Sequence, residues 1–315
     1  MSGAEDEFGE IARLFRPLTF GAAGAFDLMD DAAVIQSRPG CDLVVTKDAV
    51  VEGVHAPQGE APGLIAQKLV RVNLSDLAAK AAEPAGCFLA VAWPRAYGPA
   101  EHAAFAEGLA EDLRAFGLPL LGGDTVVTPG PAWASLTALG WVPQGKMVRR
   151  AGARSGDVVW VSGTIGDGAL GLAALRGDVP DTSGFLLERY RRPNPRLDLR
   201  EQIRACASAA ADVSDGLVAD AGHIAEASGV RLILDLQRMP LSGPAREWLR
   251  VQTDRDAALL RLATGGDDYE IVCAAPPGCA LPGFTAMGEI ASGAGVEVRA
   301  GARKLDVGPG GWRHF

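Results

Sequence analysis

The stretch DVSDGLVAD, residues 212–220, places three carboxylates within nine positions. Asp212, Asp215 and Asp220 are separated by apolar residues together with Ser214 and Gly216. Like charges at this spacing repel one another, and a chain that needs only a turn does not require so many of them. The arrangement indicates that these aspartates hold something, and a cation would cancel their repulsion.

The same stretch opens a predicted helix. Residues 214–229 begin with Ser and Asp, which are good N-cap residues, and the segment ends at a glycine. Two more helical patterns cover 63–82 and 99–117. Strand-like apolar runs lie at 41–46, 87–93, 134–142, 157–163 and 231–236. Because strands and helices alternate along the chain, the predicted fold class is α/β (α+β).

The chain of 315 residues is long enough for two domains, at about 150 residues each. Between 143 and 156 the apolar pattern gives way to Pro, Gly and basic residues. We therefore predict an N-terminal domain over 1–148 and a C-terminal domain over 149–315. Residues 177–198 are rich in Pro and charge and are predicted to form a surface excursion of the second domain.

Composition disfavours several classes of function. The net charge of −9 is the wrong sign for a nucleic-acid-binding protein. No apolar run approaches the roughly 18–20 residues that span a bilayer, and the acidic N-terminus does not resemble a signal peptide. The five cysteines show no C-x-x-C spacing. They indicate reduced thiols and a cytoplasmic protein.

Two Gly-rich motifs only partly match phosphate-binding loops. GWVPQGK (140–146) has most of the P-loop spacing, but Met147 stands where Ser or Thr must hold magnesium, and no helix is predicted to follow. GDGALG (166–171) lacks the second strand and acidic residue of a dinucleotide site. We interpret it as a tight turn whose backbone N–H groups can still point at a phosphate.

Acidic residues beside Gly, Ser or Thr recur along the whole chain, most of them at predicted strand ends or helix starts. They are Asp30, Asp31, Asp48, Glu52, Asp76, Asp124, Asp267, Asp268 and Glu270. One such acid is usually a cap, but an unpaired charge in apolar surroundings is costly, so several together predict bound cations. Mg²⁺ prefers oxygen ligands and substrate phosphates, and no Cys-His cluster favours zinc. The pattern predicts a magnesium-dependent phosphate-handling site without a P-loop.

Short motifs in a fixed order give the chain a family resemblance. In sequence they read DEFGEIARLF, MDDAAV, VVTKDAVVEGVH, VNLSDLAAKAAEP, GGDTV, RAGARSGDVVWVSGTIGD, DVSDGLVADAGHIAEASG, GGDDYEI and GWRHF. The chain resembles the thiamine-monophosphate kinases, a family with the aminoimidazole-ribonucleotide-synthetase fold. The resemblance implies transfer of the ATP γ-phosphoryl group to thiamine monophosphate, which gives thiamine diphosphate and ADP. It also implies a two-domain protomer whose N-terminal mixed sheet pairs with a second copy, hence a homodimer.

The resemblance also assigns site residues. The implied metal ligands, for several Mg²⁺ ions, are Asp30, Thr46, Lys47, Asp48, Asp76, Asp124, Asp212 and Asp215. The implied ATP contacts are Gly123, Asp124, Arg150 and Ser214, and the implied thiamine contacts are His55, Asp267 and Trp312.

Four positions depart from the family pattern. Met29 stands in place of a Gly, Ala56 in place of an aromatic residue and Asp267 in place of a Glu. Lys47 replaces a Thr, and an ammonium group cannot ligate Mg²⁺, so only its carbonyl oxygen can serve. The supporting acids Glu52 and Asp220 are interpreted as caps or as partners of the ligands.

The implied chemistry needs few catalytic groups. A phosphate monoester is already anionic near neutral pH, since its second pKa is about 6, so no general base is assigned. Arg150 is predicted to stabilise charge on the transferred group, because its planar fork suits phosphate oxygens. Arg149 is the alternative for this role.

Other functions remain open from the sequence. A selenophosphate-type synthetase needs a Cys in residues 1–30, which hold none, and a hydrogenase-maturation relative needs a C-terminal Cys, whereas this chain ends in GWRHF. Aminoimidazole-ribonucleotide synthetase itself is disfavoured by the VEGVH and GWRHF segments. A non-catalytic sensor of nucleotide or thiamine phosphate would keep the same acidic loops. Release of ADP distinguishes the kinase from the sensor.

Overall fold

A computed structural model describes residues 7–308. Contacts divide the chain into two compact units. Unit 1 is Met1–Leu77 with Ala82–Gly145, and unit 2 is Ala78–Ala81 with Lys146–Phe315. No helix within 7–308 has both the length and the apolar character needed to cross a membrane.

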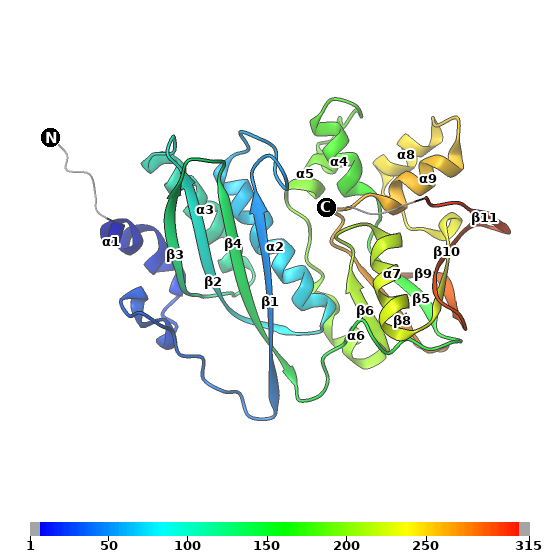
Figure 1. The fold of residues 1–315 in the computed structure, drawn as a ribbon, viewed down its shortest axis with the longest axis horizontal. Helices are drawn as coiled ribbons and strands as arrows, with labels where there is room; N and C mark the ends of the chain where they lie inside the picture. Colours follow the sequence, from blue (N-terminus) through cyan, green and yellow to red (C-terminus); the bar gives the residue numbers. More distant parts are fainter. Residues whose placement is uncertain (1–6, 309–315) are drawn as a thin grey trace. The chain divides into compact units, whose positions relative to one another are not determined.

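Unit 1 is built on a four-stranded mixed sheet in the order β1-β4-β2-β3. The strands are β1 (Cys41–Val51), β2 (Glu83–Pro94), β3 (Leu120–Thr128) and β4 (Trp133–Pro143). β4 is antiparallel to both of its neighbours, whereas β2 and β3 run parallel. Helices α2 (Pro62–Ala79) and α3 (Pro99–Ala115) lie on one face of this sheet (Figure 1).

Helices α2 and α3 approach each other through two glycines. A Cβ on Gly108 would lie 2.3 Å from the carbonyl oxygen of Gly63 and 2.5 Å from its Cα. No side chain fits in that space, so the pair sets the closest approach of the two helices. Sequence periodicity does not reveal such a contact, because both glycines sit inside ordinary helical patterns.

A chain of short helical turns precedes the sheet of unit 1. Helix α1 (Glu7–Glu10) is followed by turns at Ile11–Phe15, Arg16–Thr19 and Ala23–Leu28. A small apolar cluster joins the last of these turns to strands β3, β4 and β2 through Ala25, Leu121, Leu139, Leu28 and Phe88. The cluster positions the acidic residues that follow Leu28.

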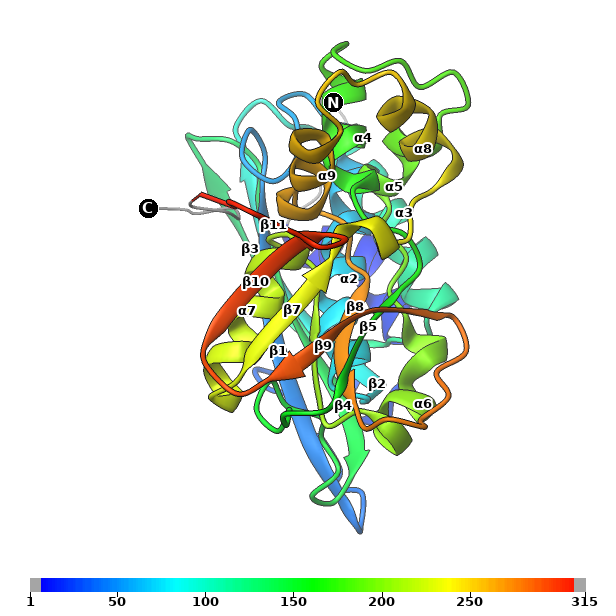
Figure 2. The same cartoon turned by 90° about the vertical axis from the view of Figure 1, so that its right-hand side faces the viewer.

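Unit 2 contains a seven-stranded mixed sheet in the order β11-β10-β7-β9-β5-β8-β6 (Figure 2). Its strands are β5 (Val158–Ser162), β6 (Ala209–Asp212), β7 (Arg231–Asp235), β8 (Ile271–Ala275), β9 (Phe284–Ala291), β10 (Gly295–Ala300) and β11 (Arg303–Leu305). Its helices are α4 (Asp167–Leu175), α5 (Phe185–Arg191), α6 (Arg200–Cys206), α7 (Leu217–Ser228), α8 (Gly243–Arg250) and α9 (Arg255–Thr264). Among the strand pairs of this sheet that the structure describes up to residue 308, only the β10–β7 pair is parallel.

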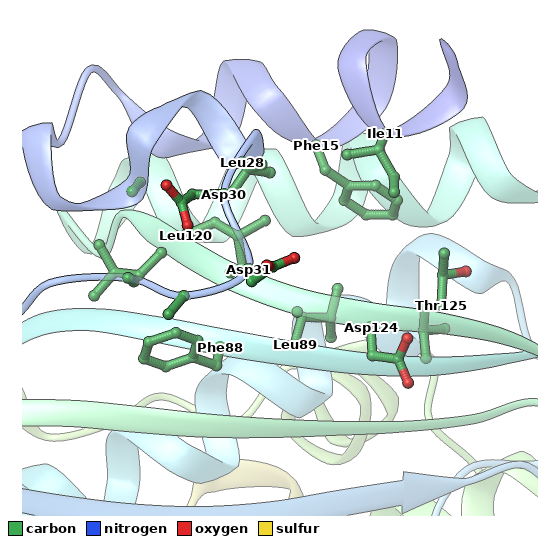
Figure 3. A pocket seen from close by; sticks show the side chains of 17 residues that line it. Ile11, Phe15, Leu28, Asp30, Asp31, Phe88, Leu89, Leu120, Asp124 and Thr125 are labelled. Atoms are coloured by element: carbon green, nitrogen blue, oxygen red, sulfur yellow. The ribbon is translucent and has the colours of Figure 1, made fainter. Parts of the chain in front are cut away.

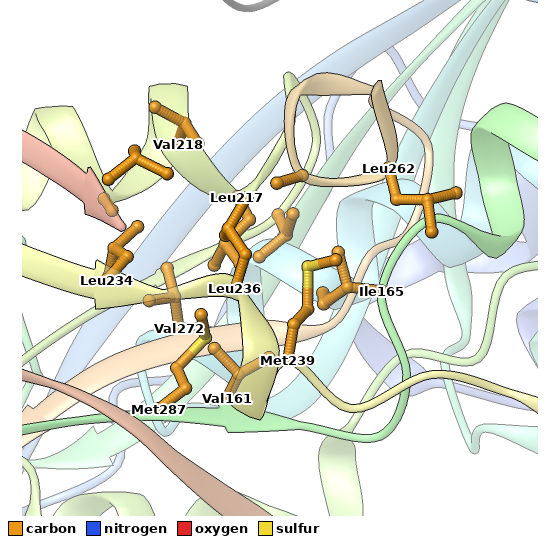
Figure 4. Packing of buried hydrophobic residues seen from close by; sticks show 14 of the residues in the cluster. Val161, Ile165, Leu217, Val218, Leu234, Leu236, Met239, Leu262, Val272 and Met287 are labelled. Atoms are coloured by element: carbon orange, nitrogen blue, oxygen red, sulfur yellow. The ribbon is translucent and has the colours of Figure 1, made fainter. Parts of the chain in front are cut away.

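The main core of unit 2 lies between the sheet and helices α7 and α9. Leu217 and Val218 of α7 meet Leu234 of β7 and Val272 of β8, and Leu262 of α9 closes the cluster (Figure 4). Burying side chains of this size stabilises the unit by about 1.5–3 kcal/mol each. The core fixes where α7 begins, and hence where the acidic loop before it lies.

The structure contains every strand and helix that the sequence predicted, with shifted ends. Helix α7 begins at Leu217 rather than at 214, so Ser214 and Asp215 lie in the turn before the helix. The prediction of a surface excursion over 177–198 was wrong, because the segment contains helix α5, whose Leu186 and Tyr190 are buried. The sequence did not predict this helix because the surrounding segment is rich in Pro and charged residues and the buried face of the helix is short.

The contact between α2 and α3 gives a test of the packing. We expect Gly108→Ala to lower the apparent melting temperature, because overpacking of this kind costs about 1–3 kcal/mol. Gly222→Ala on α7 is the matched control: its Cβ would meet only a side-chain atom of Val296, at 3.8 Å. That change is expected to be neutral or to stabilise by about 0.5–1 kcal/mol. Scanning calorimetry measures both, and equal shifts would contradict the tight contact.

Candidate functional site

The acidic loop of unit 2 is tied to a second loop by backbone hydrogen bonds. Asp212 is the last residue of β6 and pairs with Ile271 of β8. Beyond the strands, the N–H of Tyr269 donates to the carbonyl of Val213 (2.8 Å), and the N–H of Asp267 donates to that of Ser214 (2.9 Å). Residues 212–215 and 267–269 therefore form one structural element, although more than fifty positions separate them in the sequence.

Gly266 allows this close approach. A Cβ at that position would lie 2.3 Å from the carbonyl oxygen of Ser214. Gly265 is also tightly packed, since a Cβ there would lie 2.4 Å from the Cβ of Ala169. Packing thus explains both glycines of the TGGDDYEI motif without reference to any ligand.

Three possible metal ligands converge at the start of α7. One ligand atom each from Asp215, Asp220 and His223 lies within 4.8 Å of the others. Asp220 is 1% exposed, and its Oδ2 accepts the N–H of Asp215 (3.0 Å). Burial, and next to it the charge of Asp215, raises the pKa of Asp220 to about 7. The sequence analysis does not assign His223 to the site; its spacing of three from Asp220 on a helix is the signal that could have indicated it.

Arg150 is the arginine that acts on this loop. Its positive charge lowers the pKa of Asp220, against the larger effect of burial. Its carbonyl accepts the hydroxyl of Ser228 at the end of α7 (3.2 Å). The carbonyl of Arg149, in turn, accepts the N–H of Ala210 in β6 (2.9 Å). The segment is thus anchored beside β6 and α7, where the charge of Arg150 acts on Asp220.

Unit 1 contains a pocket of about 310 Å³ at strand β3 (Figure 3). Its apolar wall is formed by residues that include Ile11, Phe15, Phe88 and Leu120. Its polar part brings together Asp30, Asp31, Gly123 and Asp124. In Figure 3 the side chain of Asp31 also projects into this region from the loop above the strand. The structure thus adds Asp31 to the acids that line the pocket.

A second acidic group of unit 1 lies between β1 and α2. The hydroxyl of Thr46 donates to Oδ2 of Asp76. The N–H of Asp48 donates to Oδ1 of Asn73, one turn earlier on α2 (3.0 Å). Since alternate residues of a strand point to opposite faces, Thr46 and Asp48 share the face toward α2, and the side chain of Lys47 points away from it. The side chain of Lys47 therefore cannot join this group, and its ammonium group could not ligate Mg²⁺ in any case.

Within one chain the sheet separates Asp48 from Asp124. Strand pairing aligns Asp124 with Ala90, Ser135 and Ala49 across the sheet. Asp124 therefore shares the face of Ala49, whereas Asp48 occupies the other face. Three strand spacings, roughly 14 Å, also separate the two edges. The pocket acids and the β1–α2 acids of one chain thus cannot ligate the same ion.

His55 is held in a defined tautomer by the loop after β1. Its Nδ1 accepts the N–H of Val51 (3.2 Å), so in the neutral ring the proton is on Nε2. The ammonium group of Lys68, which is buried on α2, donates to the carbonyl of His55 (3.0 Å). Glu52 supports the same loop, because its carboxylate accepts the N–H groups of Gly59 and Ala132. His55 is thereby presented as a hydrogen-bond donor.

Several site residues lie in other positions than the sequence suggested. Asp48 and Asp124 lie within strands and Asp76 in the last turn of α2, not in loops at strand ends or helix starts. The N–H groups of Gly166 and Gly168 in the GDGALG turn donate to Asp268, at 2.8 and 3.0 Å. That turn is therefore already satisfied by a carboxylate, and the suggestion that it receives a phosphate was wrong. Trp312 lies outside the described residues.

Comparison with known proteins defines the class. The model of the AIR synthase related protein N-terminal domain matches residues 29–142, and that of the C-terminal domain matches residues 154–300. The chain therefore belongs to the AIR synthase related family, and the fold class predicted from the sequence is confirmed.

Similarity within that class is closer still. The thiamine-monophosphate kinase of Caulobacter vibrioides is 54% identical over 98% of this chain and 90% of its own length. The crystal structure of thiamine-monophosphate kinase from Stenotrophomonas maltophilia K279a is 39% identical, with a TM-score of 0.78 over 86% of this chain and 90% of that one. A structure of AaThiL complexed with AMPPCP and TMP is 30% identical, with a TM-score of 0.80 over 98% and 97%. The chain is a member of the thiamine-monophosphate kinase family, as the motifs predicted.

The buried acid of the α7 site predicts a pH-dependent stability. Between the ordinary pKa of 3.8 and the raised value of about 7, the unfolded chain releases the proton of Asp220 while the folded chain keeps it. The contribution of Asp220 to the free energy of unfolding is therefore largest at low pH, and it falls as the pH rises through that window. At about 1.4 kcal/mol per pH unit the fall is at most about 4 kcal/mol.

The test is Asp220→Asn, measured by thermal unfolding with a chelator present. We expect the variant to gain stability relative to the wild type from pH 4 to 7 and to show no further gain above pH 7. Asp178→Asn, which changes an exposed acid, is the control and is expected to show a flat difference. A flat difference for Asp220→Asn as well would contradict the raised pKa.

Proposed function

We propose that this chain transfers the γ-phosphoryl group of ATP to thiamine monophosphate, giving thiamine diphosphate and ADP. The observation that carries the proposal is the hydrogen bond from the N–H of Asp267 to the carbonyl of Ser214. It joins the residue assigned to the thiamine acceptor to the loop assigned to metal and nucleotide. The names of the relatives, and the AMPPCP and TMP bound in the similar AaThiL structure, support the same reaction.

The pocket of unit 1 suits a nucleotide. Its apolar wall offers Phe15, Phe88 and Leu120 to a base, and its polar end offers the backbone of Gly123 and the carboxylate of Asp124. Binding sites for cofactors commonly combine such a wall with a few polar groups. The family resemblance also assigns Arg150 and Ser214 to ATP.

The donor set fits Mg²⁺. The ligand oxygens belong to carboxylates, a hydroxyl and backbone carbonyls, which are the groups that hard cations prefer. The approach of Asp215 to Asp220 leaves two carboxylates close together, and a bound cation would compensate their charge. The assigned ligands are Asp30, Thr46, the carbonyl of Lys47, Asp48, Asp76, Asp124, Asp212 and Asp215. When bound, such ions neutralise the charge of the phosphates.

The protein's own groups then align two polyanions. His55 donates from Nε2 toward the acceptor phosphate, and Asp267 accepts from the thiamine end. No side chain needs to remove a proton, because the acceptor oxygen is already anionic. Arg150 stabilises the charge on the transferred group, since it is positioned beside the acids at α7. Catalysis in this scheme is positioning plus charge neutralisation.

Removal of single ligands tests the assignment. We expect Asp124→Asn and Asp212→Asn each to lower turnover by about 100-fold or more, because each removes an anionic ligand while the side chain keeps its shape. The measurement is coupled release of ADP with thiamine monophosphate and Mg²⁺ at saturating concentrations. Asp178→Asn serves as the control and should retain full activity.

Two results would contradict the proposal in different ways. Near-normal turnover in either ligand variant would remove that acid from the metal site. Tight binding of ATP and thiamine monophosphate by the wild type, with no ADP released, would favour the alternative of a non-catalytic sensor. An ATP-using synthetase of the same superfamily would release ADP with another acceptor.

The face of the unit 1 sheet that points away from α2 suits a second copy of the chain. Val45 (56% exposed), Val126 (47%) and Leu43 (39%) all lie on that face by strand alternation and register. Apolar side chains gathered on an open sheet face usually mark an interface. We assign this face to the homodimer contact.

Two adjacent valines on β3 test this contact. Val126 and Val127 are both exposed, but successive residues of a strand point to opposite faces. Val126→Lys is expected to shift the protein from dimer to monomer in light scattering, because a charge must then be buried in the interface. Val127→Lys is expected to leave the mass unchanged. A monomeric wild type, or equal effects of both changes, would exclude this face.

The proposed compartment is the cytoplasm. All five cysteines are free thiols, and Cys87 and Cys273 are buried. Free thiols in this number are typical of a reducing environment.

A further inference from the structure

A buried ionic cluster lies next to the loop that carries Asp267. Three acidic residues are each at most 1% exposed to solvent: Asp167, Asp268 and Glu270. Two arginines of the 177–198 segment reach them, Arg189 from α5 and Arg196 just after it. Burial raises the pKa of Asp268 and that of Asp167, so three acids and two guanidinium groups can coexist without a large excess of negative charge.

The loop beside this cluster has an unusual backbone. Asp267 and Tyr269 adopt left-handed conformations, with φ of +67° and +51°. Such values cost a non-glycine residue on the order of 1–3 kcal/mol and persist only where the surroundings impose them. Between and after these two residues, Asp268 and Glu270 are buried in the ionic cluster. The loop is therefore anchored at alternate positions, while Asp267 stays partly exposed.

Arg189 is the residue that joins these anchors. One of its guanidinium nitrogens, Nη2, donates both to Oε1 of Glu270 (2.9 Å) and to the carbonyl of Asp268 (3.0 Å). It thus holds the peptide group between Asp268 and Tyr269, one residue beyond Asp267. Asp268 adds a second anchor, because its carboxylate accepts two N–H groups at the start of α4. Helices α4 and α5 pack together, so both anchors belong to one rigid support (Figure 1).

Arg196 pairs with the same glutamate as Arg189 and therefore serves as a comparison for it. Its Nε and Nη2 donate to the two oxygens of Glu270, at 2.6 and 2.5 Å. It therefore takes part in the same ion pair as Arg189. The hydrogen bond to the carbonyl of Asp268, however, is donated by Arg189.

We propose that Arg189 is a positioning residue for the acceptor substrate: by holding the carbonyl of Asp268 and the carboxylate of Glu270, it fixes the left-handed loop that presents Asp267 to thiamine monophosphate. This inference rests on the proposed function. Arg189 acts through Asp267 and does not touch the substrate. The segment that the sequence suggested to be a surface excursion is thereby assigned a role in recognition of the acceptor.

The test compares Arg189→Lys with Arg196→Lys. A lysine keeps the positive charge, but its side chain is shorter than that of arginine, so its ammonium group cannot take the place of Nη2 against both acceptors. We expect Arg189→Lys to raise KM for thiamine monophosphate by about tenfold and to leave kcat and KM for ATP within about twofold, as a misplaced binding group does. Arg196→Lys is expected to lower the melting temperature by a similar amount and to leave all three kinetic constants near the wild-type values.

A double-mutant cycle separates positioning from general stability. If Arg189 acts through Asp267, Arg189→Lys adds little to the rise in KM that Asp267→Asn alone produces. Additive effects, or an equal rise in KM from Arg196→Lys, would overturn the proposal. Should Arg189→Lys not fold, Asp268→Asn removes part of the second anchor and is expected to raise the same KM; an unchanged value would again overturn it.

The controls also distinguish this inference from the proposed function. A wild type without kinase activity on thiamine monophosphate would reject the proposed function itself. An active wild type, whose KM for thiamine monophosphate rises in Asp267→Asn but not in Arg189→Lys, would reject only the role of Arg189.

Discussion

The backbone pairing between the end of β6 and the loop that enters β8 is the interaction on which the site in unit 2 depends. Three N–H groups of this pairing, those of Val213, Asp267 and Tyr269, donate to carbonyls across it. Backbone bonds are insensitive to the chemistry of side chains, so they hold the two acidic loops at a fixed distance whatever ions are present. The repulsion between the carboxylates is thereby opposed by the fold itself rather than by pairing among the acids.

This constraint explains why the acids of the molecule fall into two kinds. Those buried against arginines or helix N–H groups, such as Asp268 and Glu270, hold the loops in place. Those that remain partly exposed, such as Asp30 and Asp124, line a pocket. The buried acids fix the geometry of the loops, and the exposed acids are available as ligands. The GGDDYEI motif places the partly exposed Asp267 beside the buried Asp268 and Glu270.

The sequence revealed the family and the fold class, but not the local geometry around the predicted site residues. The helical pattern predicted α2 because that pattern is long, whereas a short apolar run predicted only the first part of β1. It failed at α5, where one turn of buried residues is surrounded by arginines that normally indicate solvent. Nor could it show that the GDGALG turn is capped by Asp268, about a hundred positions later, since no local pattern records a long-range partner.

The division of Asp48 and Asp124 between two faces of one sheet is the finding with the widest consequence. A single Mg²⁺ ion binds its oxygens at about 2.1 Å, so no ion can be shared by groups roughly 14 Å apart on opposite faces. The pocket acids and the β1–α2 acids of one chain must therefore serve separate ions. Two substrates that carry phosphates need charge compensation at several points along their length, and separate ions supply it. The distribution of acids is thus better suited to aligning two phosphorylated molecules than to activating one water molecule or one side chain.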